Sequence, residues 1–489
     1  METRQSEIRF ARLVPLLTGL GALALYLALP SHYYNFDGVA CAIAVELGDL
    51  KHLVHGNHLL YGVAGHAFHQ ALLALGIPIS ALKALHLMDS LLGAAGAGLM
   101  CGLLRRQKFP DWIAALCAAG MAVTYGWWLW SLEAQVYILG TFFLLLSLDE
   151  ALRDRPAPYR LALYHALAML SHASHALFAP VALYALWRSH ADRAGLRRAL
   201  SRYLLTATII VVAAYLAAAV WWVRPADMGE LRVWLLGSAA LGPGRTFLWY
   251  NASGPIDAVT TWCETGARLV APWRLLALPL WGAALWALAF ARERRLVWSA
   301  WLWIPAYAPL FLTYEPYNLD YRLGDLIPLW LMAALAVRRL TEIPYGKAIS
   351  LLYVLTLGTA NLAAGILPAS RAEGNRTLQK ALWLAETTPQ DAWIAAMAYD
   401  EVYIPYFALR HPLNLRYFQG REDALGARIR RLEGEGRPVY VTSDIFPFGW
   451  REAFSRMRLQ ESGRLGDVIL YRVSAPVDQR PKGKPKGRR

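Results

Sequence analysis

The chain has 489 residues, of which 57% are hydrophobic and only 17% are charged, and its mean hydropathy is +0.31. Soluble domains carry about 25% charged residues, so this composition excludes an ordinary soluble protein and indicates one that folds in a lipid bilayer. The net charge of +14 does not indicate a nucleic-acid partner, because the basic residues fall in short runs between apolar segments, as in the cytoplasmic loops of membrane proteins. The four cysteines lack zinc-site or disulfide-framework spacing, and no cofactor is expected.

Apolar segments recur along the first three quarters of the chain, and a membrane-spanning helix needs about 20 such residues. Spans are predicted at 10–29, 79–104, 111–130, 132–149, 203–223, 270–291, 296–313, 323–338 and 347–367. The first follows Arg4, Arg9 and Arg12 without a convincing cleavage site, so it is expected to remain as an uncleaved helix.

The segment 160–188 is long, contains three histidines, and has arginines on both flanks. A single crossing would place one arginine cluster outside, so the positive-inside rule favours a helical hairpin that returns to the cytoplasmic side. With this hairpin counted as two, the sequence predicts an all-α polytopic membrane domain, 1–368, of about eleven helices. This topology exports the chain after residue 368 and places three loops outside: 30–78, 224–268 and 314–322.

The composition changes near residue 370 to that of a soluble domain. Helical periodicity and short strand-like runs alternate there, which predicts a small α/β domain over 369–475 outside the membrane. The expected helices are 378–386 and 422–432, and the expected strands are 393–396, 415–418, 439–442 and 468–471. The basic tail, 476–489, is rich in Pro, Gly and Lys and is expected to be disordered.

Asp37 follows the first apolar segment directly, within an aromatic setting at the start of the external loop 30–78. An ionisable side chain this close to the apolar layer indicates a functional site. The alternative is that Asp37 only caps the helix that follows it.

Two amphipathic segments of the same loop, 39–50 and 58–75, are too short or too polar to span and are expected to lie in the interface. Glu46 and Asp49 stand on the first. Half of the twelve histidines fall in this loop: His32, His52, His55, His58, His66 and His69. The spacing of His52, His55 and His58 would place imidazoles on neighbouring helical positions and could bind a metal, but no carboxylate stands at a fixed offset, so no metal site is expected.

Two further polar clusters fall on the same side of the membrane in this topology. Glu133 and Tyr137 are one helical turn apart at the external end of the predicted fourth helix, where Glu133 could instead only stabilise a helix N-terminus. The loop before the predicted span 323–338 carries Glu315, Asp320, Arg322 and Asp325 among aromatic residues. The alternative for Arg322 is a structural salt bridge with Asp320 or Asp325.

Several elements together resemble the GT-C superfamily of membrane glycosyltransferases, in particular bacterial relatives of protein O-mannosyltransferases and lipid A aminoarabinose transferases. They are the acidic Asp37, the histidine element from His55 to Tyr61, Glu133 with Tyr137, the sequence LSHASHALFAP, the external Arg322 before LGDLIPL, and an exported C-terminal domain. The resemblance covers nearly the whole chain. Relatives tend to have Glu-Val-Tyr where this chain has Gln-Val-Tyr ending at Tyr137, and the usual proline-rich element after the first histidine is replaced by Gly-Asn.

This resemblance implies transfer of a sugar from a polyprenyl-phosphate-sugar donor to a hydroxyl of an acceptor protein, lipid or glycan, with inversion, on the periplasmic face of the bacterial inner membrane. It implies Asp37 as the general base and Arg322, or else His58, as the cation for the lipid phosphate. The other residues expected to bind substrate are His55, Glu46, Asp49, Glu133, Tyr137 and Asp320. The competing hypotheses are a transporter or flippase of lipid-linked sugars, for which repeat symmetry and mid-membrane charges are missing, and a non-catalytic scaffold. The sequence specifies neither the sugar nor the acceptor.

Overall fold

The computed structural model describes residues 2–236 and 253–475. The expected disorder of the tail 476–489 and part of the external loop 224–268 lie outside these residues. The chain divides into two compact units, Met1–Arg371 and Ala372–Arg489, and each is described by itself. Among the described residues the regular elements of the first unit are all helices, and the second unit contains a small sheet. A helical domain followed by a C-terminal sheet domain is therefore confirmed.

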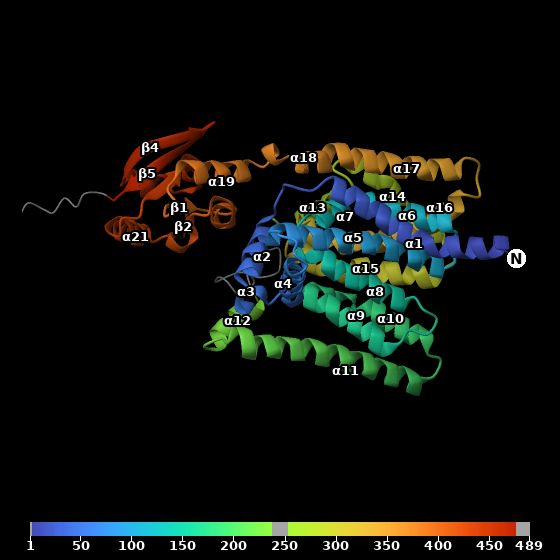
Figure 1. The fold of residues 1–489 in the computed structure, drawn as a ribbon. Helices are drawn as coiled ribbons and strands as arrows, with labels where there is room; N and C mark the ends of the chain where they lie inside the picture. The colour runs from blue at the N-terminus through green and yellow to red at the C-terminus, as the bar shows by residue number, and fades with distance from the viewer. Residues whose placement is uncertain (1, 237–252, 476–489) are drawn as a thin grey trace, which may run out of the picture. The chain divides into compact units, whose positions relative to one another are not determined.

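The first unit contains helices of very different length (Figure 1). Its helices are α1 (Glu2–Ala28), α2 (Phe36–Leu47), α3 (Leu50–Leu53), α4 (Leu59–Ala74), α5 (Ala81–Arg106), α6 (Asp111–Val123), α7 (Tyr125–Leu132), α8 (Val136–Ala151), α9 (Pro158–Ser171), α10 (Ala179–Ser189), α11 (Arg193–Ala217), α12 (Met228–Leu236), α13 (Pro255–Val270), α14 (Leu278–Phe290), α15 (Arg294–Thr313), α16 (Leu326–Leu340), α17 (Gly346–Asn361) and α18 (Leu367–Ala369). Short 3-10 or π turns join them: η1 (Ala173–Phe178), η2 (Ala218–Val223), η4 (Arg274–Ala277), η5 (Asp320–Asp325) and η6 (Leu362–Ile366).

Four helices of the described residues are long and apolar enough to cross a bilayer, or up to six if each of two bent pairs counts as one span. The bent pairs are α6 with α7, at 63°, and α13 with the helix that follows it, at 85°. The expected eleven spans are therefore not confirmed. Helix α8, for example, has 16 residues and rises about 24 Å, less than the hydrocarbon thickness of about 30 Å.

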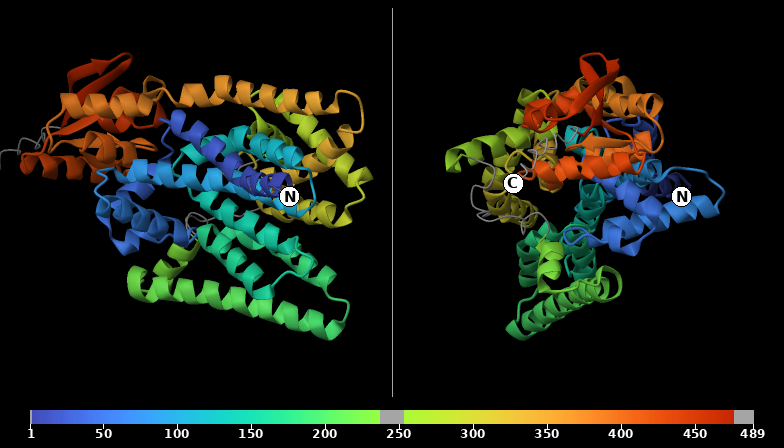
Figure 2. Two further views of the ribbon diagram at one scale, coloured as in Figure 1. Left: turned by 45° about the vertical axis from the view of Figure 1, so that its right-hand side comes forward. Right: turned by 90° about the vertical axis from the view of Figure 1, so that its left-hand side faces the viewer.

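Small residues bring α1 and α5 together along the bundle. A Cβ on Gly98 would lie 2.9 Å from the Pro15 carbonyl oxygen, and one on Gly19 would lie 3.1 Å from the Ala94 carbonyl oxygen. Such close backbone approach is the usual way in which membrane helices pack. By contrast, α11 lies at the edge of this unit beside α9 (Figure 2), and only 11% of its apolar window is buried, as expected for a helix that faces lipid.

The predicted hairpin at 160–188 forms as α9, the turn η1 and α10. Both of its ends contact the end of α8 or the connector that follows it: the Arg160 guanidinium donates to the Glu150 carboxylate at 2.7 Å, and Arg188 Nη2 donates to the Arg153 carbonyl oxygen at 3.2 Å. The segment thus enters and returns on one side, and the hairpin is confirmed. At its tip His165 Nε2 bonds the His175 carbonyl oxygen at 2.8 Å, which closes the turn.

The second unit is a five-stranded mixed sheet with helices (Figure 1). Its strands are β1 (Trp393–Ala396), β2 (His411–Asn414), β3 (Val439–Thr442), β4 (Arg458–Leu465) and β5 (Val468–Ser474), in the order β2-β1-β3-β5-β4. Its helices and turns are η7 (Ala372–Gly374), α19 (Arg376–Thr387), α20 (Asp400–Tyr403), η8 (Ile404–Ala408), η9 (Leu415–Phe418), α21 (Glu422–Gly434), η10 (Ser443–Phe448) and α22 (Arg451–Ser455). β1 pairs in parallel with β2 and β3, whereas β5 is antiparallel to β3 and β4.

Most of the predicted elements of this unit are confirmed, but the strand at 415–418 is wrong. That segment is the 3-10 turn η9, and the strand is the preceding His411–Asn414, which pairs in register with β1. The edge strand β4 was not expected, because its sequence RLQESGRL is mostly polar and exposed.

Candidate active site

Asp37 lies in the first turn of α2 without capping it. The cap is Asn35, whose side-chain oxygen accepts the Asp37 backbone N–H at 3.1 Å, so the interpretation of Asp37 as a cap is wrong. The carboxylate therefore remains available for other contacts and is exposed to solvent. The positive end of a helix dipole stabilises a carboxylate at this position.

Two features of its surroundings raise the pKa of Asp37. The larger is loss of hydration beside the protein wall, and the second is the negative charge of Glu315. A carboxylate whose pKa is raised in this way accepts a proton more readily than one in water, which suits a general base.

A second carboxylate, Asp320, comes from the loop between α15 and α16. The loop is ordered by a chain of contacts: the Asp320 N–H donates to the Asn318 side chain at 3.0 Å, and Asn318 Nδ2 donates to the Glu315 carboxylate at 2.8 Å. Burial raises the pKa of Asp320 to about 8, and the charges of Asp37 and Glu315 add to this effect. Residues 283 positions apart in sequence thus act on one another electrostatically, and the loops that carry them meet.

Three rings stand together at this junction and come from three different elements. Tyr137 opens α8, His172 precedes η1, and Tyr321 lies in η5. The ring centroids of Tyr137 are 5.3 Å from His172 and 5.8 Å from Tyr321, and those of His172 and Tyr321 are 5.8 Å apart. The charges of Asp320 and Asp37 act on Tyr137, so both carboxylates lie close to these rings.

A cavity of about 430 Å³ opens beside the rings and has two kinds of lining. Its polar lining consists of Asn57, His172, Ser174, Tyr314 and Tyr321. Its apolar lining consists mainly of Leu177, Leu235, Leu236, Leu310 and Phe311. A lining that combines hydrogen-bond donors with leucines fits a ligand that has both a polar head and an apolar chain.

His172 presents a fixed donor to this cavity. Its Nδ1 accepts the Ser174 backbone N–H at 3.3 Å and lies 2.6 Å from Ser174 Oγ. Because Nδ1 accepts, the proton of the neutral ring is on Nε2, which can donate to an anion. Burial is the main cause that raises the pKa of Tyr321, followed by the charge of Glu315, so its hydroxyl stays protonated and is a second donor.

Glu133 is not on the same helix as Tyr137, and that expectation is wrong. Helix α7 ends at Leu132, and Glu133 is extended, with φ −108° and ψ 144°, before α8 begins at Val136. Its carboxylate is buried and accepts Ser31 Oγ and, at 3.3 Å, the Asn35 backbone N–H. Glu133 therefore stabilises the segment between Ser31 and Asn35, which leads into the first turn of α2 and Asp37.

Glu46 and Asp49 have local structural partners. The Glu46 carboxylate accepts the Ala81 backbone N–H at the start of α5, at 3.2 Å. Asp49 caps the short helix α3 by accepting the Lys51 N–H at 3.0 Å, and it contacts His52 Nδ1 at 2.9 Å. Neither lines the cavity beside the three rings.

His52, His55 and His58 do not share a helical face, and that expectation is wrong. Helix α3 ends at Leu53, and His55 and His58 face each other in an isolated antiparallel bridge with stacked rings 4.2 Å apart. Burial lowers the pKa of both rings, and for His58 the neighbouring His55 adds to the effect. Within the part of the chain that the structure describes, no group of three or more His, Cys, Asp or Glu side chains could hold a metal ion.

Arg322 forms the salt bridge that was left open as an alternative. Its side chain is 1% exposed, and its Nε lies 2.9 Å from Asp325 Oδ2. The guanidinium also covers the ring of Trp262 at 4.2 Å and donates to the Trp262 carbonyl oxygen. A Cβ on Gly266 would come within 2.7 Å of Arg322 Nη1, so α13 is shaped to receive this side chain.

The structure thus brings together Asp37, Tyr137 and Asp320, with the turn of His55 and His58 near the cavity. The Ala173 N–H donates to the Asn57 carbonyl oxygen at 2.8 Å, which joins that turn to the hairpin tip. Sequence reasoning did not single out Asn57, Ser174, Tyr314 or Tyr321 as ligands. The only available signal was the clustering of aromatic residues around Asp320.

No protein-family model matches the sequence, and no curated protein matches it either. Solved structures do. ArnT from Cupriavidus metallidurans, a lipid A aminoarabinose transferase, matches in its apo state with a TM-score of 0.59 at 15% identity, over 96% of this chain and 98% of that chain. The same protein bound to undecaprenyl phosphate matches with a TM-score of 0.59 at 13% identity, over the same shares of the two chains.

An oligosaccharyltransferase from Archaeoglobus fulgidus, in a complex with Zn and sulfate, is a third similar structure. Its TM-score is 0.52 at 13% identity, over 88% of this chain and 68% of that chain. Likeness at such low identity is a likeness of fold. The chain therefore has the fold of GT-C glycosyltransferases, and the resemblance predicted from its sequence is confirmed at that level.

Proposed function

We propose that this protein transfers a sugar from a polyprenyl-phosphate donor to an acceptor hydroxyl, at the junction that holds Asp37, Asp320 and the cavity. The observation that carries the proposal is the pairing of two carboxylates with a nearby cavity whose lining combines polar and apolar side chains. The fold adds support, because a protein of the same fold binds undecaprenyl phosphate. The site would face the periplasm of a bacterial inner membrane, since the basic connectors lie at the other ends of these helices.

Asp37 is the general base of this mechanism. Its carboxylate takes the proton of the acceptor hydroxyl as the hydroxyl oxygen attacks the anomeric carbon, on the side opposite the phosphate. The bond from that carbon to the phosphate oxygen breaks, and its electron pair leaves with the polyprenyl phosphate. The products are the glycosylated acceptor with inverted configuration, the lipid phosphate, and a proton that passes from Asp37 to water.

The environments of the two carboxylates divide their roles. With a pKa raised to about 8, Asp320 carries its proton at neutral pH and cannot serve as the base, whereas it can donate a hydrogen bond to a sugar hydroxyl. Asp37 is more exposed, and Glu315 is the one charge that contributes to its shift. Pairs of titratable groups whose pKa values are driven apart are typical of acid–base sites.

The leaving phosphate needs donors near the hydrocarbon edge, where water screens charge poorly. His172 and Tyr321 line the cavity, and the Nε2–H of the first and the hydroxyl of the second supply such donors. The leucines and Phe311 of the same lining suit the first isoprene units. Arg322 does not bind the phosphate directly in this mechanism. It binds Asp325 and Trp262 and so fixes the turn η5, which carries Asp320 and Tyr321.

The proposal is tested in cells that carry the gene, its deletion, or single variants, by mass spectrometry of protein, lipid and glycan fractions. The wild type should add a sugar to one class of acceptor, which also identifies the sugar. Asp37→Asn should abolish that product, since loss of a general base costs about 10²- to 10⁴-fold. Asp49→Asn is the matched control, because it removes a carboxylate from the same loop that does not line the cavity. A product that persists in Asp37→Asn cells at the wild-type level contradicts the mechanism.

A further inference from the structure

A second polar cavity lies at the opposite ends of the membrane helices. Helix α5 begins where Ala81 contacts Glu46, in the external loop, and it is 26 residues long and ends at Arg106. At about 1.5 Å per residue it separates its two ends by about 39 Å. Near Arg106 the connectors after α5 and α8 meet the start of α15 around a cavity of about 450 Å³. The length of α5 therefore separates this second cavity from the external site of the proposed reaction.

The lining of this basic pocket is strongly cationic. Five basic side chains contribute to it: Arg106, Lys108, Arg153, Arg155 and Arg295. Only two acidic side chains do so, Asp149 and Asp154. The lining therefore carries an excess of three positive charges, a composition that fits an anionic ligand.

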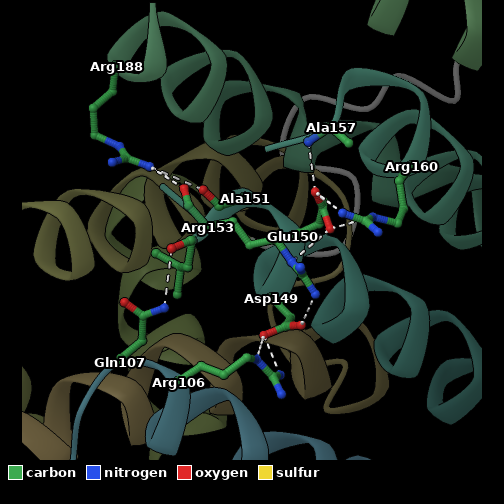
Figure 3. A network of polar contacts seen from close by, with 10 residues as sticks. Arg106, Gln107, Asp149, Glu150, Ala151, Arg153, Ala157, Arg160 and Arg188 are labelled. Atoms are coloured by element: carbon green, nitrogen blue, oxygen red, sulfur yellow. Dashed lines mark hydrogen bonds and ion pairs between the residues drawn. The ribbon is translucent and has the colours of Figure 1, made fainter. Parts of the chain in front are cut away.

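Figure 3 shows two of these cations with acidic partners: Arg106 with Asp149, and Arg153 with Asp149 and Glu150. Arg106 Nε donates to Asp149 at 2.8 Å. Arg153 is paired as well, because its Nε lies 3.0 Å from Glu150, outside the lining, and its Nη2 lies 3.9 Å from Asp149. Arg295 Nη1 lies 2.6 Å from Asp154, while its buried Nε has no hydrogen-bond partner. Within residues 2–236 and 253–475, Lys108 and Arg155 form no ion pair.

Lys108 is held at the pocket by a backbone conformation that lysine disfavours. Its φ is +64°, in the left-handed region, which costs about 1 kcal/mol or more for a residue with a Cβ. The turn is fixed on both sides: the Lys108 N–H donates to the Arg105 carbonyl oxygen at 2.9 Å, and Phe109 is buried beneath the guanidinium of Arg338. A glycine would adopt this turn with less strain. Lysine at position 108 therefore lowers the stability of the folded chain.

A neighbouring cavity offers a comparison within the same chain. It has a volume of about 490 Å³ and is lined by Arg292, Arg338, Arg339, Glu293 and Glu342 among others. Two of its three arginines are paired with its own glutamates, Arg338 with Glu293 and Arg339 with Glu342. The lining of this neighbouring cavity therefore carries an excess of one positive charge, against three in the lining of the basic pocket.

The pocket lies at the depth of lipid head groups. Arg188 donates to the carbonyl oxygens of Ala151 and Arg153, which places the end of α10 beside it. The preceding Trp187 is 60% exposed, as is usual for tryptophan where hydrocarbon meets water. An anion that reaches this position from the membrane is the phosphate of a lipid.

We propose that the basic pocket binds the phosphate head group of an anionic phospholipid in the leaflet on this side of the membrane. Lys108 and Arg155 contact the head group, and the ion-paired Arg106 and Arg295 hold the pocket open. Such pockets between membrane helices are a known way for proteins to bind anionic lipids. The inference does not depend on the proposed transferase activity.

The test uses the purified full-length protein and native mass spectrometry with phosphatidylglycerol or phosphatidylcholine. The double variant Lys108→Gly/Arg155→Ala should bind phosphatidylglycerol roughly 10- to 30-fold more weakly than the wild type, from about fivefold for each basic residue. Its affinity for phosphatidylcholine should not change. Because glycine relieves the left-handed turn, its unfolding midpoint should not fall below that of the wild type.

The matched control is Arg193→Ala/Arg197→Ala, which removes two exposed cations from the start of α11 on the same side. This control should keep the wild-type preference for phosphatidylglycerol. Equal losses in both double variants, or no loss in the pocket variant, would overturn the proposal. Displacement of the lipid by millimolar glycerol 3-phosphate would assign the pocket to a soluble phosphate and overturn the lipid assignment as well.

Discussion

Replacing Asp320 by Asn removes a carboxyl group whose pKa is raised from 3.8 to about 8 in the folded protein. At pH 7 the folded chain keeps this proton, while the unfolded chain has lost it. This difference in proton binding lowers the free energy of unfolding of the wild type at pH 7 by about 4 kcal/mol, at 1.36 kcal/mol per pKa unit, relative to a chain with a neutral side chain at this position. Because the side chain is partly exposed, solvent screening lowers the expected gain of the Asn variant to about 2–4 kcal/mol.

The sign of the pH dependence follows from the raised pKa. Between pH 3.8 and pH 8 the folded state binds more protons than the unfolded state, so the stability of the wild type falls as the pH rises through this window. Asp320→Asn lacks this slope. Its advantage in thermal unfolding, measured in detergent, should therefore be large at pH 7.5 and shrink at pH 4.5 to about 1 kcal/mol.

Activity provides the second readout of the same variant. If Asp320 is protonated during turnover, the neutral amide of Asp320→Asn should retain much of the transfer rate at pH 7, whereas Asp37→Asn should lose it. A variant that is less stable than the wild type at pH 7.5, or whose advantage is equal at both pH values, would refute the assignment of a neutral Asp320.

Three further predictions concern charges around the site and in the second unit. Glu315→Gln should lower the pKa of Asp37, because it removes the charge that helps to raise it; the acidic limb of the kcat/KM profile should then move to lower pH, and an unmoved limb would contradict this. Arg322→Ala should lower stability by about 3–5 kcal/mol, since it leaves Asp325 buried without its cation, and Arg322→Lys should lower it less. Loss of transfer in Arg322→Lys at unchanged stability would instead indicate a direct phosphate contact. Lys380→Met should lower the unfolding midpoint of the second unit in the full chain, because Lys380 binds two carboxylates at 2.7 Å, and an unchanged midpoint would refute this.

The sequence predicted the features that depend on local pattern. The apolar period predicted a helical membrane domain, basic flanks predicted the hairpin of α9 and α10, and alternating elements predicted most of the sheet. The position of Asp37 next to the first apolar segment made it a candidate, and its role as a base stays a prediction. Each of these features depends on neighbours in sequence or on the chemistry of the bilayer.

The features that were missed depend on distant contacts. No Gly or Pro marks the break at 133–135, where the helix ends because buried Asp89 accepts the Gln135 backbone N–H at 2.9 Å and Glu133 accepts Ser31. The partner of Arg322 could not be chosen from sequence, because Asp320 and Asp325 are both near it in the chain. The turn η9 contains Tyr and Phe, which favour strands, yet the strand that pairs in parallel with β1 is the preceding His411–Asn414.

The central claim is that a carboxylate at position 37 activates an acceptor for attack on a lipid-phosphate-linked sugar. The most direct measurement is the release of polyprenyl phosphate from a synthetic polyprenyl-phosphate-sugar donor by the reconstituted full-length protein, using the sugar and acceptor identified in cells. The wild type should release one polyprenyl phosphate for each sugar transferred, and Asp37→Asn should release it about 10²- to 10⁴-fold more slowly, with unchanged folding. Equal rates for the two proteins, or acceptor glycosylation without release of the lipid phosphate, would contradict the account.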